Sequence, residues 1–317
     1  MAKATRLSFG ETLAELGTEI PEIVVLDADL SKSTQSQLFA KKFPERFFEM
    51  GIQETNMVGV GAGLALSGKI PFICSFAVFL TGRYETIRMS VAYNKANVKI
   101  VGTHGGLGIG EDGNSQMGLE DLSLMRSLPN MKVLQPADDR ETVQAVRYMA
   151  SHDGPMYIRL TRQKVEDVHD ENYQFEFGKA DQLKPGTDIT LIATGGTVFY
   201  TLEAAHKLEA EGIRARVINI HTLKPFDAEA IVSAARETGG LVTVEDHNVV
   251  GGLGSATAEA LCENYPAPLR RIGLQDTFGE SGSSRALYAK YGLDTEGIYR
   301  QVKQFIREKE IVSTGQI

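Results

Sequence analysis

Residues 47–76 read FFEMGIQETNMVGVGAGLALSGKIPFICSF, in which two short apolar runs flank a stretch rich in glycine and alanine. The runs FFEM at 47–50 and IPFICSF at 70–76 have the aromatic and β-branched residues that are typical of strands. The stretch between them predicts a helix that starts close to Glu54. The segment therefore predicts a strand–helix–strand unit, the building block of a parallel sheet.

The same alternation continues on both sides of this segment. Further apolar runs occur at 23–29 (IVVLDAD), 98–103 (VKIVGT), 131–138 (MKVLQPAD) and 155–160 (PMYIRL). Their apolar residues occupy successive positions, as in strands that helices cover on both faces. We expect an α/β domain with a doubly wound, mostly parallel sheet over residues 1–165.

Residues 166–187 are charged and poor in aliphatic side chains, and they end in a Pro-Gly turn, so we expect a connection here and not another layer. Strand patterns then restart at 189–195, 215–221, 240–247 and 269–276, with helices expected at 198–211 and 294–308. This predicts a second, smaller α/β domain over residues 188–317.

Composition narrows the class of protein. The chain has 317 residues with a net charge of −8, and its apolar runs are too short for a membrane helix of about 20 residues. An acidic chain is a poor ligand for nucleic acid. The only cysteines, Cys74 and Cys262, stand in apolar surroundings, so we expect reduced packing thiols in a cytoplasmic protein.

Glu54 is the first candidate for chemistry. A carboxylate near a helix N-terminus has a structural explanation, because the helix dipole and the free N–H groups stabilise it by about 0.3–1 kcal/mol. The small residues of 57–68 also allow another backbone to approach this helix, which indicates an interface. These residues alone leave the structural and the catalytic interpretation of Glu54 open.

The chain resembles the thiamine-diphosphate-dependent transketolases, specifically the pyrimidine-binding and C-terminal domains that some organisms encode as a separate subunit. The resemblance covers nearly the whole chain and rests on six ordered segments. They are ATRLS at 4–8, DADLSKS at 27–33, GIQETNM at 51–57, SFAVFLTGR at 75–83, THGGLGIGEDGNSQMGLEDLSLMRSLPNM at 103–131 and LTRQ at 160–163.

The resemblance implies a cofactor site for thiamine diphosphate. Glu54 matches the glutamate that hydrogen-bonds N1′ of the aminopyrimidine and so promotes loss of the proton at C2 of the thiazolium. Phe79 matches the ring that stacks on the aminopyrimidine, with Phe76 as its aromatic neighbour. Asp29, in the DADLSKS segment, is a further cofactor residue by the same resemblance.

The resemblance also implies a sugar phosphate substrate, from which a two-carbon ketol unit is transferred. His104 matches a catalytic and sugar-facing histidine, and Asp112 matches an aspartate that binds a hydroxyl of the donor. Gln116 stands where single-chain transketolases usually have a histidine that binds the donor. The matching phosphate-binding set is Arg6, Ser33 and Arg162.

Two features depart from the family pattern. Gly82 stands where the family often has a tyrosine, which leaves the aromatic wall thinner. The GDG motif and following asparagine that hold the diphosphate and Mg²⁺ belong to an N-terminal domain that this sequence lacks. We therefore expect a partner subunit that carries this domain and an α2β2 assembly.

Other interpretations remain. The same resemblance fits the β subunit of a 2-oxoacid dehydrogenase or half of a deoxyxylulose-phosphate synthase, although the GEDG and SLPNM segments favour transketolase. The turn GGLGSA at 251–256 fits a nicotinamide-dependent oxidoreductase, but it lacks the full GxGxxG spacing. A catalytically silent subunit is a further alternative. The remaining histidines have no metal-ligand spacing, so no metal site is expected on this chain.

Overall fold

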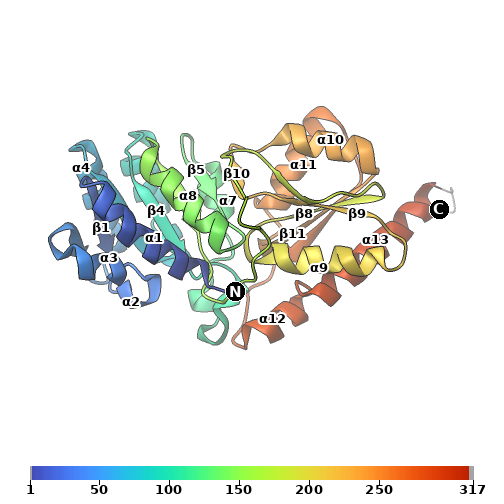
Figure 1. The fold of residues 1–317 in the computed structure, drawn as a ribbon, viewed down its shortest axis with the longest axis horizontal. Coiled ribbons are helices and arrows are strands. Elements are labelled where there is room, and N and C mark those ends of the chain that lie inside the picture. Colours follow the sequence, from blue (N-terminus) through green and yellow to red (C-terminus); the bar gives the residue numbers. More distant parts are fainter. Residues whose placement is uncertain (1, 314–317) are drawn as a thin grey trace.

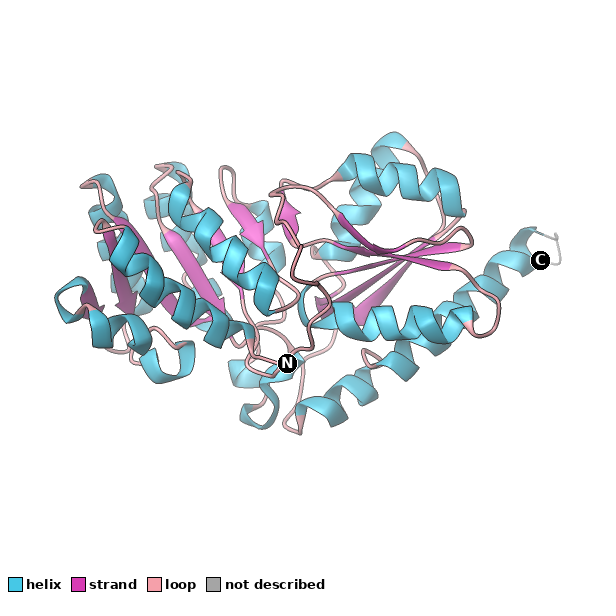
Figure 2. Cartoon of the chain, in the orientation of Figure 1, coloured by secondary structure: helices cyan, strands magenta, loops and turns pink. Residues whose placement is uncertain are grey.

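The computed structural model describes residues 2–313, with side chains described as far as residue 309. A seven-stranded and a five-stranded sheet form the centres of its two halves (Figures 1 and 2). The strand order in the larger sheet is β10-β5-β6-β4-β3-β1-β2, with only β10 antiparallel to its neighbour. Its strands are β1 (Ile23–Asp27), β2 (Phe47–Glu49), β3 (Ile70–Phe76), β4 (Lys99–Thr103), β5 (Lys132–Leu134), β6 (Met156–Arg159) and β10 (Thr222–Lys224).

Helices cover both faces of this sheet. They are α1 (Thr5–Glu19), α2 (Ser31–Thr34), α3 (Gln37–Lys42), α4 (Glu54–Leu66), α5 (Ala77–Thr81), α6 (Tyr84–Thr86), α7 (Asp121–Ser127) and α8 (Asp139–Ser151). Other helical segments of this half are the 3-10 helices η1 (Pro44–Arg46), η3 (Leu107–Asp112) and η4 (Asn114–Gln116) and the π-helix η2 (Ile87–Tyr93).

Strand β1, which lies between β3 and β2, shows why the apolar runs are continuous. Ile23 and Val25 pack in one core with α1, α3 and α8, while Val24 and Leu26 pack in another with α4 and α5. Since successive side chains of a strand point to opposite faces, a strand between two helical layers needs apolar residues at every position. This confirms the predicted doubly wound, mostly parallel sheet.

The smaller sheet has the order β12-β11-β8-β9-β7, with only β7 antiparallel. Its strands are β7 (Asp181–Lys184), β8 (Ile189–Ala193), β9 (Ala215–Asn219), β11 (Leu241–Asn248) and β12 (Leu269–Leu274). The helices around it are η5 (Gly195–Thr197), α9 (Val198–Glu209), α10 (Ala228–Thr238), α11 (Leu253–Asn264), α12 (Ser284–Tyr291) and α13 (Thr295–Ser313). In Figure 1, α10 and α11 lie on one side of this sheet, and α9 and α13 lie on the other.

Three details differ from expectation. Residues 181–184 of the expected connection form β7, which pairs with β9. Strand β10 leaves the second half and pairs with β5 of the first sheet. Each sheet thus takes one strand from outside its expected segment, and the division into 1–165, 166–187 and 188–317 stays a prediction. Cys262 lies exposed on α11, so the expectation that both thiols are packed was wrong for this one.

The connection is anchored to the first half by a buried ionic cluster. Asp138 is the N-cap of α8 and also accepts hydrogen bonds from the backbone of Val168 and His169. The His169 ring lies 2.8 Å from Asp138 and 3.0 Å from Asp181 of β7. One histidine thus links helix α8, the connection and the second sheet.

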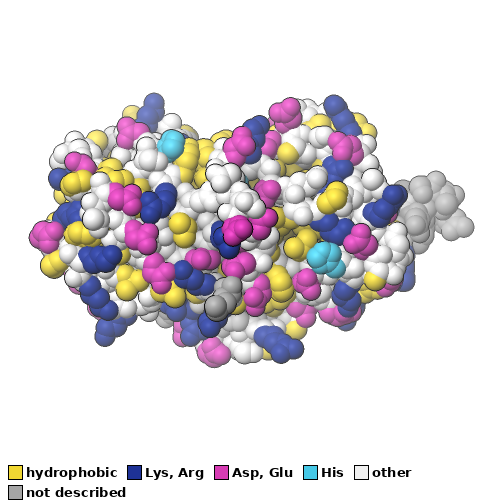
Figure 3. Space-filling view, viewed as in Figure 1, with side chains coloured by type: hydrophobic (Ala, Val, Ile, Leu, Met, Phe, Trp, Pro, Cys, Tyr) yellow, Lys and Arg dark blue, Asp and Glu magenta, His cyan; other side chains and the backbone are white. Residues whose placement is uncertain are grey.

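The surface carries mixed charge, with acidic and basic side chains interspersed over the face in Figure 3. In the described part of the chain, no helix is long and apolar enough to cross a membrane.

Candidate functional site

The candidate residues gather at the carboxyl edge of the parallel strands of the larger sheet, where ligands bind in doubly wound folds. They end or follow β1 (Asp29, Ser33), β2 (Glu54), β3 (Phe76, Phe79), β4 (His104, Asp112, Gln116) and β6 (Arg162). Arg6 reaches the same edge from the first turn of α1. Strands β2, β1, β3, β4 and β6 are consecutive neighbours in the sheet, so the candidates form one continuous band.

Glu54 is the first residue of α4, and only 4% of its surface is exposed. Its carboxylate faces the side chain of Arg83, with Oε2 3.9 Å from the guanidinium. The amide groups at the start of the helix favour negative charge here. The Glu54 carboxylate is thus nearly buried, and its ion pair with Arg83 is a long one.

Three rings form a stack beside the sheet edge. The ring of His104 stacks on Phe76 with centroids 3.8 Å apart, and Phe76 stacks on Phe79 with centroids 5.6 Å apart. Phe76 is buried, whereas Phe79 is half-buried on α5. Because offset stacking favours planar partners, the partly open ring of Phe79 can accept a flat heterocycle.

Arg6 and Arg162 are brought together by contacts between the chain start and the end of β6. The backbone of Lys3 pairs with that of Val165, and the Thr161 N–H donates to Oγ1 of Thr5 at 2.8 Å. Burial, followed by repulsion from the nearby guanidinium group of Arg162, lowers the pKa of Arg6.

The cluster around Arg6 also contains Ser33 and His104. The Arg6 guanidinium donates to the backbone oxygen of Ser33 at 2.6 Å and lies 3.3 Å from Nε2 of His104. Arg162 donates to the backbone oxygen of Ile109 at 3.0 Å. The structure thus brings Arg6, Ser33, His104 and Arg162 together, and two neighbouring guanidinium groups suit an anion such as a phosphate.

His104 is neutral in this setting. Burial, followed by the positive charges of Arg6 and Arg162, lowers its pKa to about 3. Nε2 therefore accepts from Arg6, while Nδ1 donates to Oγ1 of Thr103, which lies 2.8 Å away. This network assigns the proton to Nδ1 and leaves Nε2 as the hydrogen-bond acceptor that faces the cluster.

Asp112 and Gln116 lie in the two short helical segments that follow His104. Asp112 ends η3 and is exposed, whereas Gln116 ends η4 and is half-buried. They share with His104 a loop that follows β4, so the loop conformation decides whether they face the same ligand.

Asp29 lies at the same edge but its side chain is exposed. Its backbone has a positive φ of 63°, and its N–H donates to the carboxylate of Glu49 at 2.7 Å. The neighbouring Asp27 was missed by sequence reasoning. It is buried, and its carboxylate accepts hydrogen bonds from the N–H of Leu30 and from the hydroxyl groups of Thr34, which ends α2, and Ser36. An acidic residue that ends an apolar strand was the available signal.

The turn at 251–256 does not resemble a dinucleotide site in three dimensions. The buried carboxylate of Glu245 accepts hydrogen bonds from the N–H groups of Leu253 and Gly254 at 2.7 and 2.8 Å. These are the amides at the start of α11 that a pyrophosphate would use. A Cβ at Gly252 would lie 2.0 Å from the same carboxylate, so the glycines serve close packing.

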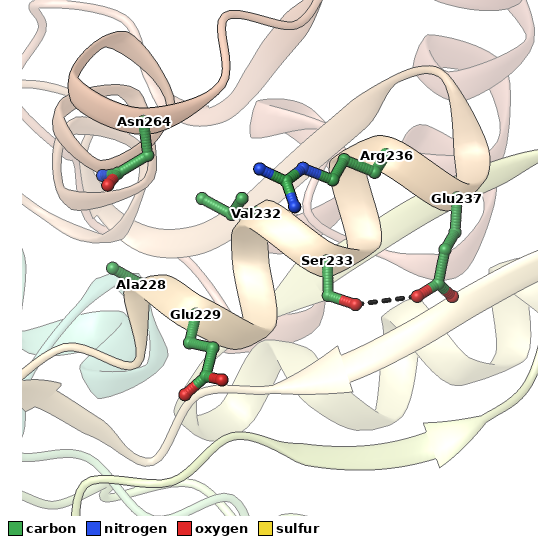
Figure 4. Close-up of a pocket in the computed structure, with 7 residues that line it drawn as sticks. All are labelled: Ala228, Glu229, Val232, Ser233, Arg236, Glu237 and Asn264. Carbon is green, nitrogen blue, oxygen red and sulfur yellow. Dashed lines mark hydrogen bonds between the residues drawn. The ribbon is translucent and has the colours of Figure 1, made fainter.

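A separate hollow of about 700 Å³ lies over α10 and α11 in the second half. Figure 4 shows its mixed lining, in which Ser233 donates to Glu237 at 2.7 Å while Arg236 lies close by. Its lining residues include none of the candidates. Across the described residues, no group of three or more histidine, cysteine or acidic side chains is arranged to hold a metal ion.

Comparison with known proteins gives matches along the chain. The family model described as "Transketolase, pyrimidine binding domain" matches residues 1–167, and the model described as "Transketolase, C-terminal domain" matches residues 178–298. A putative transketolase C-terminal section from Methanocaldococcus jannaschii is 46% identical over 97% of this chain and 98% of that protein.

Two further relatives are similar over almost their whole lengths. A 6-deoxy-6-sulfo-D-fructose transketolase subunit from Clostridium sp. is 43% identical over 96% of this chain and 95% of that protein. A solved structure described as a split gene transketolase, inactive beta4 tetramer, is 51% identical with a TM-score of 0.89, covering 96% of this chain and 98% of that one.

Proposed function

The chain belongs to the transketolase family, and on this premise we propose that it is the C-terminal subunit of a split transketolase, which transfers a two-carbon ketol unit between sugar phosphates. The observation that carries this proposal is the band of residues at the sheet edge. It combines a nearly buried carboxylate, a stack of rings and a pair of guanidinium groups, which fit a cofactor ring and a phosphorylated substrate.

The residues on this chain fit the aminopyrimidine half of thiamine diphosphate. Phe79 offers a stacking surface, and Glu54 offers an acidic oxygen in a nearly closed site. When bound, thiamine diphosphate supplies the nucleophilic carbon and the electron sink that ketol transfer needs. Glu54 would hold a proton at the ring nitrogen, and Phe79 with Phe76 would fix the ring plane. Asp29 is proposed as a further contact to the cofactor.

The arginine pair is proposed to bind the phosphate of the sugar. Arg6 and Arg162 approach this edge from opposite ends of the first domain, and Ser33 supplies a half-buried hydroxyl beside them. Neutral His104 can accept a hydrogen bond from a sugar hydroxyl at Nε2 when Arg6 turns toward the phosphate. Asp112 and Gln116 are proposed to bind further hydroxyls of the donor.

The identity of the sugar depends on the departures from the family pattern. A glutamine at 116 keeps a donor and an acceptor but has no proton to transfer near neutral pH. A relative at 43% identity is named for a sulfonated sugar and another at 41% identity for apulose 4-phosphate, so relatives of this subunit type are named for different sugars. We propose a phosphorylated ketose for this chain because the guanidinium pair is present.

We propose that an N-terminal subunit completes the site and holds the diphosphate and Mg²⁺, in an α2β2 assembly. The exposed face of α4 supports a partner here. Leu66 at the end of α4 is 68% exposed, Ile52 just before the helix is 76% exposed, and a Cβ built at Gly59 or Gly63 would meet nothing within 4 Å. A smooth apolar face that begins at the proposed catalytic glutamate fits a subunit interface.

The test uses the purified chain, the candidate partner encoded by a gene with a GDG…N motif, and their mixture. With thiamine diphosphate and Mg²⁺ present, we expect ketol transfer only in the mixture. The inactive β tetramer of the 51% identical relative is consistent with this expectation. Turnover by the isolated chain would overturn the proposal of a split enzyme. Binding of a nicotinamide cofactor would favour the alternative of an oxidoreductase, although the carboxylate of Glu245 already occupies the amides that a pyrophosphate would use.

A further inference from the structure

The loop between β4 and α7 carries all three residues that we propose face the sugar, namely His104, Asp112 and Gln116. It contains glycines at 105, 106, 108, 110, 113 and 118, of which 106, 110 and 113 have positive φ angles of 83°, 82° and 79°. A segment so rich in glycine loses much conformational entropy when it is ordered. Hydrogen bonds within the loop, such as that from the N–H of Gly106 to the backbone oxygen of Gly118, therefore need support from contacts outside the loop.

Several of these contacts come from the second half of the chain. The buried carboxylate of Asp246, on β11, accepts a hydrogen bond from the N–H of Leu107 at 2.8 Å. The hydroxyl of Ser284, at the start of α12, donates to the backbone oxygen of Gly108 at 2.8 Å. The N–H of Gly279 donates to Oδ1 of Asn114 at 2.9 Å.

Asp246 is itself held in place. The hydroxyl of Tyr288 donates to its other oxygen at 2.8 Å, and Gln163 donates to that hydroxyl at 2.9 Å. Tyr288 lies on α12, the same helix that Ser284 begins. The two contacts to the loop therefore belong to one rigid part of the second half.

The glycines of the loop match this surface closely. A Cβ at Gly106 would lie 2.1 Å from the Asp246 carboxylate, and one at Gly113 would lie 2.4 Å from the Ser281 hydroxyl. Glycine at these positions thus allows the second half to approach the loop backbone, beyond supplying the positive φ angles.

We propose that the C-terminal domain determines how the donor sugar is bound, with Asp246 and Ser284 as positioning residues that act through the loop. This inference rests on the proposed function and adds to it a role for the second half. Glu54 and Phe79 lie on α4 and α5, so loosening the loop should weaken binding of the sugar and leave binding of the cofactor unchanged.

Ser284→Ala is the variant to test, and Ser283→Ala is its matched control. Ser283 is the neighbouring residue, but its hydroxyl caps α12 by accepting from the N–H of Ala286 and makes no contact with the loop in the structure. Loss of one hydrogen bond should raise KM for the ketose donor about two- to ten-fold in Ser284→Ala. We expect unchanged kcat, an unchanged Kd for thiamine diphosphate, and recovery in Ser284→Thr.

Hydrogen–deuterium exchange provides a readout that does not need activity. In the full chain, amides of peptides covering residues 105–113 should exchange faster in Ser284→Ala than in the wild type or Ser283→Ala. Exchange of these peptides at the wild-type rate in Ser284→Ala would overturn the inference, whether or not ketol transfer is observed. Absence of ketol transfer together with faster loop exchange would instead overturn the proposed function and keep the structural coupling.

Discussion

Replacing Arg162 with alanine should separate phosphorylated from unphosphorylated donors. One charge-assisted hydrogen bond to a phosphate contributes about 1.5–3 kcal/mol, and 1.4 kcal/mol corresponds to about ten-fold in an equilibrium constant. The Arg162 side chain is 37% exposed, so solvent screens part of its charge. We therefore expect the lower end of this range, a loss of about ten-fold in kcat/KM for a ketose phosphate.

The assay compares a ketose phosphate with hydroxypyruvate, which has no phosphate, on the reconstituted enzyme. The effect should appear mainly in KM, because ground state and transition state share the phosphate contact. Arg162 also donates to the backbone oxygen of Ile109, so the alanine variant loosens the loop as well. Loosening of the loop should lower activity toward both donors alike, and the loss of activity with hydroxypyruvate measures it directly.

Arg162→Lys is the matched control, because it keeps the charge but offers a single ammonium in place of the guanidinium fork. We expect a smaller loss with the ketose phosphate than in the alanine variant. Equal losses for both donors in Arg162→Ala would refute the proposed phosphate contact. Arg6→Ala then tests the other half of the guanidinium pair with the same two donors.

Three further predictions concern the cofactor site and the junction between the halves. Glu54→Gln should lower turnover about 10²–10⁴-fold while assembly with the partner persists. Hydrogen–deuterium exchange at C2 of the cofactor measures the loss of the C2 proton directly. A wild-type exchange rate in the variant would show that Glu54 acts only as a charge at the helix end. Gly82 has a φ of −61°, and a Cβ added there would make only ordinary contacts at 3.5 Å, so the Gly82→Tyr variant should fold. We expect its added ring to lower the Kd for thiamine diphosphate about two- to ten-fold. An unchanged Kd would show that the added ring does not contact the cofactor. Burial alone would lower the pKa of His169, but hydrogen bonds to Asp138 and Asp181 outweigh it and raise this pKa to about 10. The stabilisation from protonated His169 is thus complete below about pH 6.5 and is lost as pH rises through about 10. His169→Gln should cost about 3–5 kcal/mol near neutral pH, and its difference in Tm from the wild type should shrink between pH 7 and 10, whereas a constant difference would contradict the ionic cluster.

Strand positions were predictable wherever burial on both faces left a continuous apolar run. The run at 70–76 coincides with β3 at both ends, and 23–29 contains β1. The two strands that sequence reasoning missed lack this signal. Strand β7 is an edge strand with a single apolar residue, Leu183, and β10 is three residues long and pairs with a partner some ninety positions earlier in the chain.

The sequence predicted which residues form the candidate site, but not the hydrogen bonds that bring them together. Family resemblance indicated Arg6 and Arg162 separately, but the threonine pair that holds their segments together has no local sequence pattern. Asp246 and Ser284 were missed for the same reason, since their partners lie in a loop more than 130 residues away in the chain. Non-local hydrogen bonds of this kind become visible only in three dimensions.

Strand β10 limits where a chain of this type can be divided. It covers the otherwise open edge of β5 with residues that the second half supplies. A fragment ending near residue 187 would present the unpaired N–H and C=O groups of that edge to solvent, which invites pairing with another copy. Splitting the gene between the two halves would therefore yield an aggregation-prone first fragment. Chimeras joined within the connection should accordingly also take residues 222–224 from the parent of the first half, so that β10 matches the β5 edge that it covers.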